Sequence, residues 1–253
     1  MPGKTIKMVL LSMMVMSAAG RAYAVEQNNV ETSTQSFSVT LGATRVIYDP
    51  DSAGATLTVI NPQDYPMLVQ SRVYEEDKKT AAPVVVTPPL FRLDGKQQSR
   101  LKIVRTGGDL PKDRESLDWL CVTGIPPKAD DVWAKENGRK KKDKVVSLNV
   151  QLSISSCLKL LFRPSSIKGG PETVASTITW RRDGKSVKVV NPTPYYISLA
   201  EVKVGGVPLA VDYVPAFGSR SFTLPKSSQG GNVEWHVIND YGGKSQVYRA
   251  SLR

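Results

Sequence analysis

This 253-residue chain contains only two cysteines, Cys121 and Cys157, and one histidine, His236, the residue types that most often bind transition metals and that include common nucleophiles and bases. A Ser-His-Asp hydrolase holds its histidine between a nucleophile and a carboxylate, whereas His236 lies in a strand-like run that favours a packed or surface position. No G-x-S-x-G elbow, P-loop or G-x-G-x-x-G motif occurs. Two carboxylates distant in sequence, as in a glycosidase, stay an open alternative. We predict no catalytic residue, no metal and no cofactor, and expect a binding protein.

The two cysteines are separated by 35 residues. An even number of cysteines in an exported chain usually forms disulfides, so we predict a bridge between Cys121 and Cys157. A metal or redox pair is the alternative, but the long separation and the lack of nearby histidines argue against it. On the chain-entropy estimate, closing a loop of this length stabilises a fold by roughly 3 to 4 kcal/mol.

Export is predicted from residues 1–24. Lys4 and Lys7 precede an apolar run of 12 residues, Met8 to Ala19, and a small-x-small pattern ends at Ala24. These features together are typical of a secretory signal peptide, and the apolar run is too short to span a bilayer as a permanent helix. We therefore expect the mature chain to begin near Val25.

The chain is basic, with 34 Lys plus Arg against 23 Asp plus Glu. A basic exported protein could bind a nucleic acid, an acidic surface or a chain terminus that presents a carboxylate, and solubility alone is the other explanation. The sequence has no recognisable DNA-binding helix, zinc module or aromatic-basic ribonucleoprotein motif. We expect no nucleic-acid partner.

The most regular pattern in the chain is "VVSLNVQLSISSC", which starts at Val145. Its apolar residues fall on every second position, separated by Ser, Asn or Gln, which predicts a strand with one apolar face. It directly follows a polar insertion, Pro126 to Lys144, that contains four consecutive cations from Arg139 to Lys142. A solvated loop is the simple explanation of the insertion, and its position beside the strand suggests a role in binding.

Short alternating runs bounded by Gly, Pro, Asn and Asp recur along the chain, and no stretch shows helical periodicity. The clearest runs are Phe37 to Leu41, Ala55 to Ile60, Met67 to Tyr74 and Ser99 to Arg105. Asp183-Gly184 predicts a hairpin with a type I′ turn. We predict an all-β chain built of sandwiches.

A composition break follows Arg163, where two prolines and two glycines come directly after an apolar strand. We therefore expect a first domain at 25–163 and a second at 164–253. Each is close in size to an immunoglobulin-like sandwich.

Five segments together resemble the PapD-like periplasmic chaperones of the chaperone/usher pathway. They are "TPPLFRL" from Thr87, "PKDRESLDWL" from Pro111, "CLKLLFRP" from Cys157, "NPTPYY" from Asn191 and "INDYGG" from Ile238. The insertion, the extended N-terminal segment and the cysteine pair resemble the long-loop branch, typified by the F1 capsule-antigen chaperone. This resemblance implies two immunoglobulin-like β-sandwich domains in an L-shaped arrangement, with a cleft between them.

The resemblance also implies a binding site for the C-terminal carboxylate of a fibre subunit. The family's basic pair matches Arg45 and Lys159. Two partly desolvated cations can form charge-assisted hydrogen bonds with a carboxylate. Ordinary surface cations would be the explanation without the family match.

In that family the last strand of domain one completes an unfinished sandwich of the subunit, a case that belongs to the general mode of strand addition. The donor row implied here is Val146, Leu148, Val150, Leu152 and Ile154. If the strand has no bulge, Cys157 and Lys159 point to the opposite face.

The resemblance implies three further features. An N-terminal strand would contact the subunit through Phe37, Val39 and Leu41, although an ordinary edge strand explains these residues nearly as well. An interdomain ion-pair cluster matches Glu115, Arg163 and Asp240. Thr87-Pro88 matches a cis peptide bond.

We therefore expect a non-enzymatic periplasmic chaperone that binds one fimbrial or capsule-like fibre subunit in a 1:1 complex and delivers it to an outer-membrane usher. The alternative is an exported immunoglobulin-like adhesin or fibre subunit. The sequence leaves open whether the unbound protein self-associates through its apolar strand, and whether the lysine-rich insertion has a second role.

Overall fold

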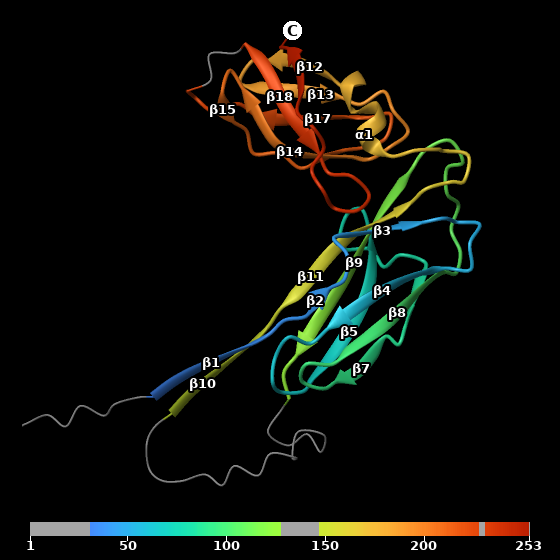
Figure 1. The fold of residues 1–253 in the computed structure, drawn as a ribbon, viewed down its shortest axis with the longest axis vertical. Coiled ribbons are helices and arrows are strands. Elements are labelled where there is room, and N and C mark those ends of the chain that lie inside the picture. Colours follow the sequence, from blue (N-terminus) through green and yellow to red (C-terminus); the bar gives the residue numbers. More distant parts are fainter. Residues whose placement is uncertain (1–30, 128–146, 228–230, 253) are drawn as a thin grey trace, which may run out of the picture.

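The computed structural model describes residues 31–127, 147–227 and 231–252, which are almost entirely β-strands. The strands form two sandwiches that meet at one end, with their long axes at an angle (Figure 1). The predicted all-β fold of two immunoglobulin-like sandwiches in an L-shaped arrangement is confirmed. The predicted signal peptide, residues 128–144 of the polar insertion and Val146 lie outside the described residues.

The first sandwich consists of two facing sheets. One has the strand order β3-β11-β9-β5-β7, where the bounds are β3 (Arg45–Tyr48), β5 (Met67–Glu75), β7 (Leu90–Leu93), β9 (Ser116–Ile125) and β11 (Ser155–Phe162). The other has the order β2-β4-β8-β6, where the bounds are β2 (Thr40–Leu41), β4 (Ala55–Ile60), β6 (Val84–Thr87) and β8 (Gln98–Arg105). A separate two-stranded sheet pairs β1 (Glu31–Phe37) with β10 (Ser147–Ser153).

Period-2 alternation explains why these segments are strands. In β4, Leu57 and Val59 are buried in the core, whereas Thr56 is exposed and Thr58 is partly exposed. Successive side chains of a strand point to opposite faces of its sheet, so one polar and one apolar face follow directly from the sequence. The predicted runs at β4, β5 and β8 agree with the structure to within one residue at each end.

The second sandwich has its own core. One sheet has the order β12-β13-β17, with β12 (Thr179–Asp183), β13 (Ser186–Val190) and β17 (Ser219–Thr223). The other contains β14 (Ile197–Val204), β15 (Val207–Pro208), β16 (Tyr213–Val214), β18 (Asn232–Val237) and β19 (Tyr248–Ser251). Trp180 and Trp235 lie at the centre of the core, with ring centroids 5.3 Å apart.

Two local predictions need correction. A single helical turn, α1 (Pro171–Val174), is followed by the 3₁₀ turn η2 (Ala175–Thr177) in the segment between the sandwiches, and elements this short produce no detectable periodicity. In the β12-β13 hairpin, Asp183 pairs with Ser186, so the two loop residues are Gly184 and the next residue. Of the two, only Gly184 has a positive φ, whereas a type I′ turn requires it at both.

The first strand of the chain changes sheets. The run Phe37 to Leu41, predicted as one strand, is split: β1 runs parallel to β10, β2 joins the opposite sheet beside β4, and β3 returns to pair with β11. At the first change, the ring of Phe37 is fully buried and packs on Tyr65, 5.0 Å between centroids. A Cβ placed on Gly124 of β9 would lie 2.4 Å from the backbone oxygen of Phe37. Only glycine therefore lets β1 cross so close to β9.

Replacing this glycine tests the crossing. Gly124→Ala should lower the free energy of unfolding by about 2 kcal/mol, because the added methyl group must displace backbone rather than a flexible side chain. Gly107→Ala is the matched control, since a Cβ there meets nothing within 4 Å. Urea unfolding of both variants measures the difference. Equal stability of the two variants would contradict the proposed close approach.

Candidate functional site

Strand β10 extends beyond the first sandwich and carries apolar side chains into solvent. In Figure 1, β1 and β10 project together from the lower left of the sandwich. Leu148, Leu152 and Ile154 are 53%, 47% and 38% exposed, and Val150 is partly exposed. Among the described residues, no strand pairs with β10 on the edge opposite β1. The structure thus combines an unpaired edge with an exposed apolar row, and four of the five predicted donor residues lie in it.

The strand is irregular at Ile154, between β10 and β11. Its N–H donates to the carbonyl of Phe37 in β1 (3.1 Å), whereas its carbonyl accepts from the N–H of Gly124 in β9 (3.1 Å). A residue in a regular ladder directs both groups to the same neighbour. The chain therefore changes its partner strand at Ile154, from β1 to β9, and the register between β11 and β9 continues without a shift from Ser155 to Phe162.

Within β11 the two faces are clear. Leu158 and Leu160 are buried in the core of the first sandwich, so Cys157 and Lys159, which alternate with them, face away from that core. The predicted disulfide is confirmed: Cys157 lies opposite Cys121 of β9 and is bonded to it. The bridge joins β11 to β9 two residues away from Lys159.

The prediction for the N-terminal contact residues is wrong as to where their side chains point. Phe37 is 1% and Val39 is 7% exposed, and both belong to the core of the first sandwich, against which Leu41 also packs. Alternation within this run therefore marks packing inside the protein's own domain. Strand β1 still lies beside the apolar strand, but it does so through its backbone register with β10.

The two predicted anchor cations lie side by side. Lys159 is opposite Arg45 in the parallel β11-β3 pair and opposite Trp119 in the antiparallel β11-β9 pair. The Lys159 side chain is only 15% exposed. Arg45 donates one guanidinium N–H to the carbonyl of Ile238 in the second sandwich (3.2 Å), and the loop after β18 reaches the first sandwich there (Figure 1).

Partial burial disfavours the charged forms of both cations. Burial lowers the pKa of the Lys159 ammonium, and the positive charge of Arg45 lowers it further. Burial also lowers the pKa of the Arg45 guanidinium, whose Nε has no hydrogen-bond partner among the described residues. An arriving anion would relieve both costs, so the pair is suited to a carboxylate.

Aromatic rings and two further cations surround this pair, and none of them was predicted from the sequence. The Lys159 ammonium lies 5.1 Å from the ring centroid of Tyr213. The Arg220 guanidinium lies 4.1 Å from the ring centroid of Tyr213, and the Lys78 ammonium lies 3.8 Å from the ring centroid of Trp119. These contacts join residues up to 54 positions apart in the chain. No local pattern could have indicated them.

The three residues predicted to form the interdomain cluster are brought together. Arg163 donates to Glu115 (2.6 Å) and makes a two-pronged contact with Asp240 (2.6 and 2.7 Å). The second oxygen of Glu115 accepts the backbone N–H of Tyr196 in the second sandwich (2.6 Å). Burial raises the pKa of the Glu115 carboxyl, and the positive charge of Arg163 partly opposes this rise. Such paired, hydrogen-bonded charges fix orientation more than they add stability.

A second polar bridge between the sandwiches was not predicted from the sequence. Glu76, just after β5, accepts hydrogen bonds from the hydroxyls of Tyr196 (3.0 Å) and Tyr213 (2.9 Å). Glu75, Glu76 and Asp118 line a cavity of about 420 Å³. Burial, together with the charges of Glu75 and Glu76, raises the pKa of Asp118 to about 6.

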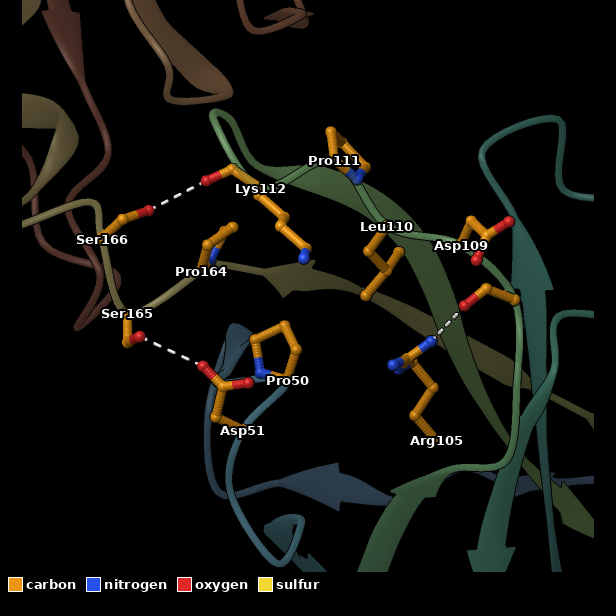
Figure 2. Close-up of a pocket in the computed structure, with 11 residues that line it drawn as sticks. Pro50, Asp51, Arg105, Asp109, Leu110, Pro111, Lys112, Pro164, Ser165 and Ser166 are labelled. Atoms are coloured by element: carbon orange, nitrogen blue, oxygen red, sulfur yellow. Dashed lines mark hydrogen bonds between the residues drawn. The ribbon is translucent and has the colours of Figure 1, made fainter.

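The cavity drawn in Figure 2 lies at the hinge and does not contain the anchor pair. It has a volume of about 440 Å³. Ser165 donates to the Asp51 carboxylate (3.1 Å), and Ser166 donates to the carbonyl of Lys112 (2.9 Å), as Figure 2 shows. These contacts tie the connecting segment to the first sandwich. We assign no ligand to this cavity.

The described ranges contain no cluster of three or more His, Cys, Asp or Glu arranged to hold a metal ion. No helix in the same ranges has the length and hydropathy needed to cross a membrane. The Thr87-Pro88 peptide bond is cis, as predicted.

Comparison with known families gives two matches that follow each other along the chain. Residues 38–168 match the N-terminal domain of PapD, described as a pili and flagellar-assembly chaperone. Residues 173–248 match the C-terminal domain of the pili assembly chaperone PapD.

Individual proteins give the same result. The chaperone protein AfaB of Escherichia coli is 58% identical over 82% of this chain and 85% of its own length. The chaperone protein caf1M of Yersinia pestis is 44% identical over 89% and 90%. Among solved structures, the E. coli chaperone DraB is 55% identical with a TM-score of 0.75, covering 88% of this chain and 100% of that one. The Salmonella enterica SafA pilin in complex with the SafB chaperone matches at 47% identity and a TM-score of 0.77, with the same coverage.

The carboxylates of Glu75, Glu76 and Asp118 give a prediction about how stability depends on pH. The folded state raises the pKa of Asp118 to about 6, so between about pH 4 and pH 6 it binds more protons than the unfolded state and loses stability as pH rises. Asp118→Asn should therefore raise the free energy of unfolding at pH 7 by on the order of 1 kcal/mol, after allowance for solvent screening. Below pH 4 the gain should vanish. Chemical denaturation across this pH range measures both.

The control is Asp113→Asn. Asp113 is exposed, and its hydrogen bond from Arg114 lowers the pKa of that carboxyl, so removing its charge should give no gain at pH 7. A loss of stability in Asp118→Asn at pH 7, or a gain that is equal at pH 4 and pH 7, would contradict the assignment.

Proposed function

Because the chain belongs to the PapD family of pilus-assembly chaperones, we propose that it captures fimbrial or capsule-like fibre subunits in the periplasm by donor-strand complementation. It forms a 1:1 complex with a subunit and passes it to an outer-membrane usher. The related SafB chaperone has been solved in complex with the SafA pilin, which supports a subunit as the partner.

The observation that carries this proposal is the exposed apolar strand β10, one edge of which pairs with no other strand among the described residues. A strand added to a sheet gains main-chain hydrogen bonds, and its alternate side chains fill pockets. Each buried methylene contributes about 0.8 kcal/mol, so Leu148 and Leu152 alone can supply a large hydrophobic term. In the subunit complex, these side chains fill the groove left by the strand that the subunit lacks.

The anchor pair supplies the second part of the site. Arg45 and Lys159 bind the terminal carboxylate of the subunit, because both are cationic, adjacent and partly desolvated. The disulfide between Cys121 and Cys157 holds β9 and β11 together beside them. The ion pairs of Arg163 keep the second sandwich in position around the anchor.

The protein has no enzymatic activity and needs no cofactor. Its export depends on the signal peptide at residues 1–24, and its two domains divide at residues 163 and 164. The alternative function, an exported adhesin or fibre subunit, is less well supported, because such a subunit would be a single sandwich that requires a strand from outside. Both sandwiches here have buried cores of their own.

The anchor can be tested by co-expression with the cognate fibre subunit. Lys159→Ala and Arg45→Ala should each lower the yield of the purified 1:1 complex at least tenfold, since the carboxylate loses a charged partner. Lys188→Ala, which removes an exposed strand lysine of the second sandwich, should leave the yield unchanged. Wild-type yield from both anchor variants would exclude the anchor, and the absence of any wild-type complex would refute the chaperone function itself.

The donor strand has its own test. Leu148→Asp should abolish complex formation, because a charged side chain would enter an apolar pocket without a partner. Leu90→Asp is matched in residue type and exposure, 49% against 53%, and should bind normally. The melting temperature of the unbound variants verifies folding. Capture of the subunit by Leu148→Asp at wild-type level would remove β10 from the site.

A further inference from the structure

The anchor site already contains a carboxylate, that of Asp212. One of its oxygens lies 3.8 Å from the Lys159 ammonium, and the other lies 3.4 Å from the Arg220 guanidinium. Among the described residues, the charges that act most strongly on Lys159 are this carboxylate and three cations, Arg45, Lys78 and Arg220. Asp212 is therefore the one carboxylate among the four charged groups that act most strongly on Lys159.

The contact between Asp212 and Lys159 is loose. At 3.8 Å it exceeds the distance of a normal hydrogen bond. The contacts between Arg163 and Asp240 are 2.6 and 2.7 Å long, so this chain forms tight ion pairs elsewhere. The Lys159 ammonium thus has a counter-ion nearby without being committed to it.

The two partners differ in freedom. The Lys159 side chain is 15% exposed, whereas that of Asp212 is 53% exposed. The backbone of Asp212 is fixed, because its carbonyl accepts the N–H of Leu199 (3.1 Å) and its neighbour Tyr213 is buried. The more exposed Asp212 carboxylate therefore has more room to change rotamer than the Lys159 ammonium, and Arg220 lies 3.4 Å from its other oxygen.

We propose that Asp212 is an internal counter-ion, which occupies the carboxylate position at Lys159 until the terminal carboxylate of a subunit displaces it. This inference rests on the proposed function of the anchor pair. Competition of this kind lowers the affinity for the subunit, which suits a protein that must also release it. It also keeps the buried ammonium paired when no subunit is present.

The test uses acetate as the simplest carboxylate, so it does not require the subunit. Sodium acetate replaces sodium chloride at constant ionic strength, and the ε-carbon NMR resonance of Lys159 is followed, assigned by its loss in Lys159→Arg. In Asp212→Asn, the acetate concentration at half-saturation should be at least threefold lower than in the wild type, because the competing carboxylate has been removed. Asp94→Asn removes an equal charge from an exposed pair with Arg92 and should match wild type.

Each outcome decides the question. A gain specific to Asp212→Asn supports the internal counter-ion. No gain, or the same gain in Asp94→Asn, overturns it, since the effect would then be absent or merely long-range. If the acetate gain is found but the wild-type protein captures no co-expressed subunit, the proposed function fails while the counter-ion assignment stands.

Discussion

The register of β11 between β3 and β9 determines where the main functional groups lie. That register places Lys159 opposite Arg45 on one side and opposite Trp119 on the other, and it places Cys157 opposite Cys121. A slip of one residue would turn each of these side chains into the core and bring the leucines out. The disulfide excludes such a slip, because it joins two residues that must stay opposite each other. The bridge therefore holds Lys159 and Arg45, the proposed anchor pair, in their register as well as stabilising the domain.

The second sandwich completes the site by covering one face of this sheet. Leu117 and Leu161 of the first sandwich pack with Tyr196 and Tyr213 of the second, in a small apolar cluster separate from the two main cores. Polar bridges flank the cluster: Arg163 binds Asp240 on one side, and Glu76 binds both tyrosines on the other. Buried charges of this kind add little net stability but penalise any arrangement that leaves one of them unpaired. Orientation between the sandwiches is thus specified by several contacts that must form together.

Local pattern was enough to predict the strands, the disulfide and the apolar row, because each depends on residue type at short, regular spacing. It failed where the same pattern serves two purposes. Phe37 and Val39 alternate as a binding strand would, yet they pack inside their own domain, and only the path of β1 across Gly124 distinguishes the two cases. The irregularity at Ile154 depends on hydrogen bonds to two different strands. Glu76 and Asp212 were missed because their partners lie far away in the sequence.

The position of the anchor at the inner end of the apolar strand has a consequence for register in the complex. Strand pairing alone tolerates a slip by two residues, since the alternation of faces is then preserved. Such a slip moves one strand along the other by about 7 Å. A terminal carboxylate bound near Lys159 cannot follow that movement and keep its charge-assisted hydrogen bonds, which require roughly 2.8 Å between the heavy atoms. The proposed anchor would thus select a single register for the subunit strand, and Leu148 and Leu152 would then meet the same pockets each time.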